Sequence, residues 1–351
     1  MTPHVVLLAC GLWIISVMAT DHWRVGLYGS IHYHPKELTA HEVKHFAQLT
    51  DVNHLQEAVQ RIARKRNVNG IGHKYIRRYI KQSLKKLDWL VQEDTFVTDN
   101  PGVGKVRLHN IVAKLTPYAN RYLMLGCHYD GNGYKKSTGS AISCAMLLNI
   151  AHVLQKEFKK IHPRPWDISL MLVFFDGKEA IGSQNNILQG SYHLVRRWAR
   201  NGFLDNIDLF VPIDLLVTDE DIHFPHMIRS TVIWYLRLRQ LENLLYHKRT
   251  KYFQAITVDL PERNDHMPFH AVHVPVLPLI TIPKPLSMRK ISKKVDYTAI
   301  EQVSVVLRLF VLEYLQISSK QKSGVNDGQV VLYPCLSLIL TLLAATSLWL
   351  A

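Results

Sequence analysis

The chain has 351 residues, 48% of them hydrophobic, a composition that excludes a disordered protein and suits one large α/β domain or two smaller ones. Its formal net charge of +14 arises from 42 Lys and Arg residues against 28 acidic ones, and much of the excess falls in residues 62–86 and 284–294. A basic chain can bind nucleic acid, but no nucleic-acid-binding motif is present and the amino terminus predicts secretion. We therefore exclude nucleic acid as a partner.

The amino-terminal residues 5–19 form an apolar run of signal-peptide length, and Val17 and Ala19 fit the small-residue rule for cleavage. We expect residues 1–19 to be a signal peptide that is removed after Ala19. The only basic residue before the run is His4, which leaves an uncleaved anchor as the alternative.

The carboxyl terminus is also apolar. Residues 330–351 are long enough to span a bilayer, and a polar spacer with small residues, 318–329, precedes them. This arrangement predicts a glycolipid-anchor signal, with attachment at Ser318, Ser319 or Ser323, and a retained transmembrane helix is the alternative. We expect a protein of the secretory pathway, lipid-anchored at the extracellular face of the plasma membrane, with the Golgi or the extracellular medium as alternatives.

Two of the four cysteines are expected in the mature chain, because Cys10 leaves with the signal and Cys335 with the tail, so that 4 − 2 = 2 remain. These are Cys127 and Cys144. In an oxidising compartment an isolated pair is expected to be bridged rather than free. A thiolate metal site is excluded because no second pair completes it.

The first predicted elements lie in a polar, His-rich stretch. We expect residues 20–70 to form a poorly packed lead-in with one helix at 55–66. Apolar residues then recur at helical spacing over 74–90, with Arg and Lys between them. The basic residues predict a solvated helix face, and contact with anionic lipid headgroups is the alternative.

The rest of the chain alternates apolar strands with amphipathic helices. The expected strands are 110–115, 121–130, 168–175, 207–216 and 274–281, and the expected helices are 140–160, 190–200, 234–247 and 298–316. The first two strands are predicted to form a hairpin or to lie side by side. The alternation predicts an α/β domain with a mainly parallel sheet and helices on both faces.

Ionisable residues follow three of these strands. The run ISLMLVFF at 168–175 is continuous rather than alternating, as in a strand buried on both faces, and it ends in Asp176, Lys178 and Glu179. The other strand-end residues are His128, Asp130 and Asp214. Ligands of open α/β sheets bind at the carboxyl ends of the strands, and carboxylates with a His there are typical of zinc hydrolases. The alternative is that Asp130 and Asp176 cap the helices that follow.

Eight ordered segments resemble the glutaminyl-peptide cyclotransferases, which are relatives of the zinc aminopeptidases: LGCHYD, SCAMLL, FFDGKEA, GSYHL, KYFQ, NDHMPF, VPVL and FVLEYL. The resemblance covers about residues 73–317 and implies one glutaminyl-cyclase-like domain at 71–317. It implies a central mixed, mostly parallel sheet and a bridge between Cys127 and Cys144. It also implies a reaction, in which an amino-terminal Gln cyclises to pyroglutamate and releases ammonia.

The family holds one zinc with an Asp, a Glu and a His, and a neighbouring Glu transfers the protons. This sequence departs from that set. The ligand Asp position is Gly139, and the Glu-Glu pair is Lys178-Glu179, so the catalytic Glu is replaced while the ligand Glu is retained. The ligand His position falls near Met288 and Arg289, and no His occurs after residue 273.

Other family positions are retained. Asp214 and Asp265 match the two remaining acidic catalytic positions, and His266 follows Asp265 as in the family. The aromatic wall of the substrate pocket is thinner, because the segment 281–295 lacks an aromatic residue. One carboxylate, Glu179, would not retain zinc, since zinc sites use three or four protein ligands. We therefore predict an impaired or inactive member that binds peptide amino termini or an extracellular protein, with an active or weakly active cyclotransferase as the alternative.

Lys178 and Arg289 are predicted to replace the charge of the metal. Without a cation, Glu179, Asp214 and Asp265 would face one another unpaired, which destabilises a fold. One alternative is that Lys178 points to solvent.

A second alternative retains a metal. In the related aminopeptidases, residues at the positions of His128 and Asp214 bind a metal ion. The loss of the bridging Asp at Gly139 weakens this prediction, because too few ligands remain.

Overall fold

The computed structural model describes residues 37–100, 104–131, 138–160, 168–179, 189–215, 222–246, 251–261, 264–281 and 295–320. The chain divides into two compact units, Met1–Ser319 and Lys320–Ala351. The expected signal peptide and the apolar carboxyl-terminal tail lie outside the described residues. None of the helices in the described ranges combines the length and hydropathy needed to cross a bilayer.

The central sheet is mixed, with strand order β1-β2-β4-β3-β5-β8. Its strands are β1 (Leu90–Asn100), β2 (Gly104–Lys114), β3 (Arg121–His128), β4 (Ile168–Phe175), β5 (Ile207–Asp214) and β8 (Leu279–Ile280). The pairings β4-β3, β3-β5 and β5-β8 are parallel, whereas β1-β2 and β2-β4 are antiparallel. Two short strands, β6 (Phe224–His226) and β7 (Phe253–Thr257), form a second sheet. The predicted α/β domain with a mixed, mostly parallel sheet is confirmed.

The helices of the described residues agree with most of the predicted ranges. They are α2 (Ala40–Ala47), α3 (Val52–Ile62), α4 (Ile71–Lys85), α5 (Thr138–Val153), α6 (Gln155–Lys160), α7 (Gln189–Arg200), α8 (Val232–Tyr246), α9 (Met267–Ala271) and α10 (Tyr297–Lys320). The predicted helix at 140–160 is divided into α5 and α6. The turn occurs at Leu154.

The prediction that 110–115 and 121–130 are neighbouring strands is wrong. These segments belong to β2 and β3, and β4 lies between them in the sheet. The edge strand β1 was not predicted at all. Its sequence LVQEDTFVTDN is largely polar because nearly all of its side chains are exposed or half-buried, so it lacks the apolar run that marks the central strands. Strand order depends on contacts between distant segments, which local patterns do not contain.

The amino-terminal region is better packed than predicted. Its described part, residues 37–70, holds two helices rather than one, and α3 begins and ends about one turn before the predicted helix at 55–66. Asp51 caps α3 by accepting the N–H of His54 at 2.8 Å. Leu55 and Ile62 on α3 are fully buried in the main core.

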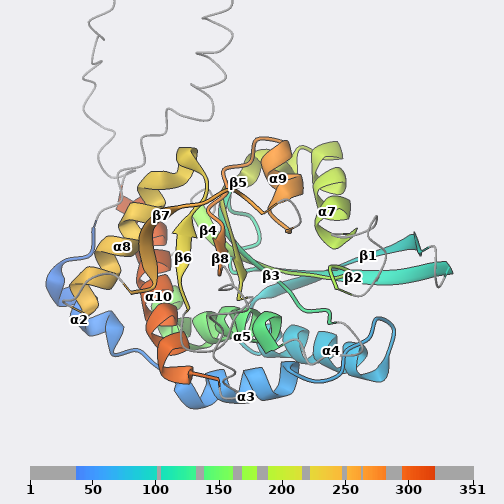
Figure 1. Ribbon diagram of the computed structural model, residues 1–351, viewed down its shortest axis with the longest axis horizontal. Helices are drawn as coiled ribbons and strands as arrows, with labels where there is room; N and C mark the ends of the chain where they lie inside the picture. The colour runs from blue at the N-terminus through green and yellow to red at the C-terminus, as the bar shows by residue number, and fades with distance from the viewer. Residues whose placement is uncertain are drawn as a thin grey trace, which may run out of the picture. The chain divides into compact units, whose positions relative to one another are not determined.

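Helices cover both faces of the sheet (Figure 1). The helices α4 and α5 pack on one face, with α3 outside α5, and α7 and α9 pack on the other. Successive residues of one strand point to opposite faces, so Leu123 and Leu125 of β3 join the α5 side of the core while Met124 joins the α7 side. This double cover explains the continuous apolar strands and leaves the carboxyl ends of β3, β4 and β5 for polar residues.

Candidate functional site

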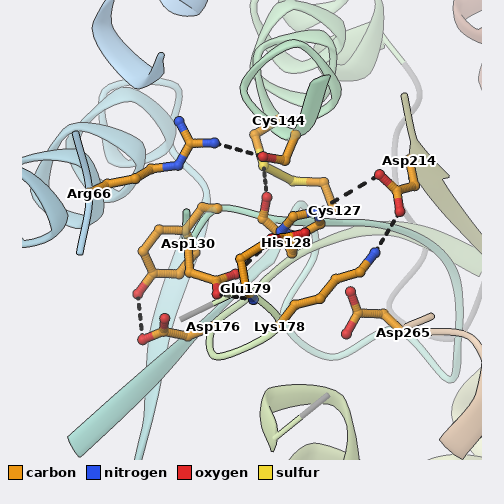
Figure 2. Close-up of polar contacts among 12 residues, drawn as sticks. Arg66, Cys127, His128, Asp130, Cys144, Asp176, Lys178, Glu179, Asp214 and Asp265 are labelled. Carbon is orange, nitrogen blue, oxygen red and sulfur yellow. Dashed lines mark hydrogen bonds and ion pairs between the residues drawn. A yellow bond between two sulfur atoms is a disulfide. The ribbon is translucent and has the colours of Figure 1, made fainter. Parts of the chain in front are cut away.

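Polar side chains converge at the carboxyl edge of the sheet (Figure 2). They come from the ends of β3, β4 and β5 and from the turn before α9. We call this group the Lys178 cluster, and its members are His128, Asp130, Lys178, Glu179, Asp214, Asn264 and Asp265. Because the three strands run parallel, their ends meet at one edge although they are far apart in sequence.

Lys178 is the centre of this cluster. Its Nζ lies 2.5 Å from Oδ2 of Asp214, and its side chain is 7% exposed. Burial lowers the pKa of the Lys178 ammonium, but the charges of Asp214, Asp265 and Glu179 outweigh burial and raise that pKa above its ordinary value. Figure 2 shows the ammonium between Asp214 and Asp265. The alternative in which Lys178 points to solvent is therefore wrong.

His128 supplies a second cation to Asp214. Its Nδ1 lies 3.3 Å from Oδ1 of Asp130, and its Nε2 lies 3.8 Å from Oδ1 of Asp214. Burial and Lys178 lower the pKa of the imidazole, but the two carboxylates outweigh them and raise it to about 9. On the Asp214 side, burial raises the carboxyl pKa, whereas Lys178 and His128 together hold it well below its usual range. The site therefore contains a carboxylate between two cations.

Asp265 faces the same ammonium but keeps a free acceptor. Its Oδ1 is buried and has no hydrogen-bond partner within the described part of the chain. Burial raises the pKa of this carboxyl, against the lowering effect of Lys178 and His128. The preceding Asn264 donates its Nδ2–H to Asp214 Oδ2 at 2.7 Å. Sequence reasoning missed Asn264, whose only signal was its place beside Asp265.

Glu179 lies at the rim of the cluster. Its side chain is exposed, while its backbone N–H donates to Oδ2 of Asp130 at 2.6 Å. Asp130 therefore holds the turn after β4.

Arg66 is a buried cation that the sequence analysis did not single out. Its guanidinium donates to the carbonyl of Ile62 and to Oγ of Ser140, both at 2.6 Å. Burial lowers the pKa of Arg66 to about 10, against the raising effect of Asp130 and Glu179. Ser140 follows Gly139 at the start of α5, so a cation stands close to the position where the family carries a ligand Asp.

Asp176 lies outside the Lys178 cluster, although it directly follows β4, the strand that also precedes Lys178. Its carboxylate accepts from His73 Nε2 at 2.9 Å, from the backbone N–H of His109 at 2.8 Å and from the hydroxyl of Tyr129 at 3.1 Å. These donors belong to α4, β2 and the residue after β3. Asp176 thus fastens helix and sheet together, and none of these three donors belongs to α7.

The disulfide between Cys127 and Cys144 is present, as predicted. It joins the end of β3 to α5, directly beside His128 (Figure 2). The bridge closes a loop of 17 residues that contains both Asp130 and Gly139. It therefore fixes the strand end that carries the cluster against the helix that covers it.

The donor set that the described residues bring to the cluster does not fit a zinc ion. Within the described ranges, no group of three or more His, Cys, Asp or Glu side chains is placed to hold a metal. Gly139 offers no side chain, and Asp214 already binds the Lys178 ammonium. A divalent cation beside Lys178 and His128 would also be repelled by both. The segment with Met288 and Arg289 lies outside the described residues, so no position is assigned to them.

Comparison with known proteins identifies the family of the chain. Residues 110–302 match peptidase family M28. The chain is 37% identical over 320 residues to the glutaminyl-peptide cyclotransferase of Drosophila melanogaster, covering 83% of this chain and 89% of that protein. It is 32% identical over 323 residues to that of Boiga irregularis, covering 81% and 87%. The crystal structure of Macrostomum lignano glutaminyl cyclase superposes with a TM-score of 0.71 at 25% identity, over 80% of this chain and 94% of that one.

Proposed function

Because the chain belongs to the glutaminyl-peptide cyclotransferases of peptidase family M28, we propose that it is a catalytically impaired member, which binds peptide amino termini or another protein at the Lys178 cluster. One observation carries this proposal. By the family resemblance, Lys178 stands at the position of the catalytic Glu. Its ammonium binds Asp214 at 2.5 Å.

The chemistry of Lys178 argues against the family reaction. A general base must take a proton from the attacking α-amine, and a lysine whose pKa is raised stays protonated at neutral pH. Zinc, where a family member binds it, would polarise the side-chain amide of the substrate. Losing that polarisation removes several kcal/mol of transition-state stabilisation, and each 1.36 kcal/mol is about tenfold in rate. Losing the base lowers the rate by roughly a further 10² to 10⁴.

The cluster nevertheless offers recognition groups for a peptide. Oδ1 of Asp265 is an acceptor without a partner in the described chain, and an N–H of a bound peptide would satisfy it. The exposed carboxylate of Glu179 lies at the rim, where a terminal ammonium can approach without being desolvated beside Lys178. Binding without turnover is therefore compatible with the charges that are present.

Metal content and turnover test this proposal together. The full-length protein, purified in detergent without chelator, is expected to contain well under one equivalent of zinc by elemental mass spectrometry. It should release ammonia from a glutaminyl dipeptide at least about 10³-fold more slowly than an active relative assayed in parallel. One equivalent of zinc with chelator-sensitive turnover would show that the chain is an active cyclotransferase and would overturn the proposal.

A converse experiment separates loss of ligands from loss of fold. The triple variant Gly139→Asp, Lys178→Glu and Arg289→His is expected to bind zinc, whereas each single variant is not, because the ligands act as a unit. If Lys178→Glu alone binds zinc, the assignment of Gly139 and Arg289 to ligand positions is wrong.

We also propose that the protein is attached to the extracellular face of the membrane through a lipid at its carboxyl terminus. The polar spacer and apolar tail of the sequence support this proposal. Phosphatidylinositol-specific phospholipase is expected to release the protein from intact cells. Retention of a chain that still carries a carboxyl-terminal epitope would instead indicate a transmembrane helix.

A further inference from the structure

A second polar site lies away from the Lys178 cluster, among the helices α3, α4 and α5. It is a cavity of about 430 Å³ lined by His54, Glu57, Arg61, Tyr75, Arg78, Tyr79, Gln82, Ser83, Lys86, Leu87, Leu148 and His152. We call it the α3–α5 cavity. Cys144 of α5 is bridged to Cys127 beside the cluster, and His152 lies about 12 Å further along the helix at 1.5 Å per residue. The two sites are therefore separate.

The α4 side of the cavity is basic. Arg78, Gln82 and Lys86 are four residues apart and so lie on one face of the helix. Neither Arg78 nor Lys86 forms an ion pair with an acidic group of the described chain, in contrast to Arg77 and Lys81 on the same helix, which both bind Glu93. Two cations thus point into this cavity without a counter-charge.

The one acidic residue of the cavity lining is already neutralised. Glu57 accepts from Arg61 through Nε at 2.8 Å and through Nη2 at 2.6 Å. The Nη1 of Arg61 donates to the hydroxyl of Tyr75 at 3.1 Å, so that hydroxyl keeps its own proton for a further acceptor. With Glu57 and Arg61 cancelling, Arg78 and Lys86 leave the cavity with a net positive charge.

The opposite wall carries two histidines in an unusual arrangement. The rings of His54 and His152 stack at a centroid distance of 4.0 Å with an interplanar angle of 8°. His152 is held by Asp51, with Nε2 at 3.1 Å from Oδ2. Burial and the neighbouring His152 lower the pKa of His54, against the raising effects of Asp51 and Glu57. An anion bound beside the pair would favour its protonated form.

We propose that the α3–α5 cavity binds a phosphate ester, with Arg78 and Lys86 contacting the phosphate and the tyrosines and Leu148 contacting the rest of the ligand. The planar guanidinium of Arg donates two N–H groups to a pair of phosphate oxygens, and Lys supplies a compact positive charge. The volume exceeds that of one phosphate ion, which is why an ester rather than the free ion is the expected occupant. The ester is either a soluble metabolite or a phospholipid headgroup. This inference goes beyond the proposed function because the α3–α5 cavity does not involve the Lys178 cluster.

Calorimetric titration of the full-length protein in neutral detergent distinguishes these sources. The probes are glycerol 3-phosphate for a soluble ester, dihexanoyl phosphatidic acid for a headgroup, and dihexanoyl phosphatidylcholine as a lipid without net charge. Arg78→Ala/Lys86→Ala is expected to weaken binding of the preferred probe about 100-fold, since each of the two lost charge-assisted contacts accounts for about tenfold. The matched control is Lys74→Ala/Lys85→Ala, which removes two exposed cations of the same helix that do not line the cavity, and it should change Kd by less than about twofold.

The outcomes are distinct. Binding of glycerol 3-phosphate with the expected loss in the cavity variant identifies a soluble ester, and binding of phosphatidic acid alone identifies a headgroup. A rise of the His54 pKa on ligand addition, followed by NMR of the imidazole carbons, would place the anion in the cavity. The proposal is overturned if neither phosphate probe binds, if phosphatidylcholine binds equally well, or if the control variant loses as much affinity as the cavity variant.

Discussion

Asp176 and Asp214 are two buried aspartates at the ends of strands in the same sheet, and they do different things. Asp176 is tied to His73, to the hydroxyl of Tyr129 and to a backbone N–H, all of which belong to the framework of the fold. Asp214 accepts instead from the Lys178 ammonium and lies beside the His128 ring. The position of an aspartate at a strand end therefore does not decide whether its carboxylate stabilises the fold or belongs to the Lys178 cluster.

The difference between the two aspartates is one of charge. Asp176 draws mostly on hydrogen-bond donors that would serve any buried carboxylate, and each such bond contributes about 1 kcal/mol net. Asp214 and Lys178 form a buried ion pair. Removal of one partner leaves the other as a buried, unpaired charge that the protein interior solvates poorly. The comparison predicts that the two sites respond differently to substitution.

The largest effect is expected from Lys178→Met, which keeps the length of the side chain and removes its charge. Asp214 and Asp265 then share the site with one fewer cation, and the free energy of unfolding should fall by roughly 3–5 kcal/mol. Urea denaturation of the full-length protein measures this change. A loss below about 1 kcal/mol would mean that Lys178 does not balance the buried acids.

The double variant Lys178→Met/Asp214→Asn provides the control for that prediction. Because both charges of the pair are removed, it should be less destabilised than the sum of the two single variants, with an interaction energy of about 1–3 kcal/mol. Strict additivity would contradict the pairing seen at 2.5 Å.

A smaller effect is expected from Asp176→Asn. The amide keeps one acceptor oxygen but presents an N–H₂ group to donors, so the free energy of unfolding should fall by roughly 1–3 kcal/mol. The same denaturation experiment applies, and ligand binding at the Lys178 cluster should be unchanged. If binding at the cluster is lost while stability is retained, Asp176 belongs to the site and the comparison fails.

The last prediction concerns pH and His266, which follows Asp265 in the chain. Burial, together with the charges of Lys178 and His270, lowers the pKa of His266 to about 3 from an ordinary value of 6.5, against the raising effect of Asp214. Below pH 6.5 the unfolded chain takes up a proton that the folded protein does not accept until about pH 3. Stability from this group is thus fully present above pH 6.5 and is lost as the pH falls, at up to about 1.4 kcal/mol per pH unit.

The variant His266→Phe removes this titration. Its stability should fall less steeply than that of the unaltered protein between pH 6 and pH 4, as followed by urea unfolding at each pH. The slopes of the two proteins would be equal if His266 were protonated as readily in the folded state as in the unfolded one.

Local sequence patterns were enough to predict much of the fold, and the order of short motifs along the chain was enough to predict the family. The apolar run of β4 was predicted at its observed bounds, because a strand buried on both faces leaves a continuous pattern. The pairing of Cys127 with Cys144 followed from a count of two cysteines and from the resemblance. Gly139 and Lys178 were interpreted as departures from the family from the neighbouring motifs, and that interpretation stays a prediction.

Only the tertiary structure decided which of these residues face one another. Lys178 and Asp214 are 36 residues apart and His73 and Asp176 are 103 apart, so no local pattern relates either pair. The same holds for the placement of β4 between β2 and β3, and for Arg66 and Asn264, whose partners lie on other elements. Side-chain periodicity indicates which face of a strand or helix is buried. The partner of a buried charge depends instead on how the elements pack, and the packing depends on residues throughout the chain.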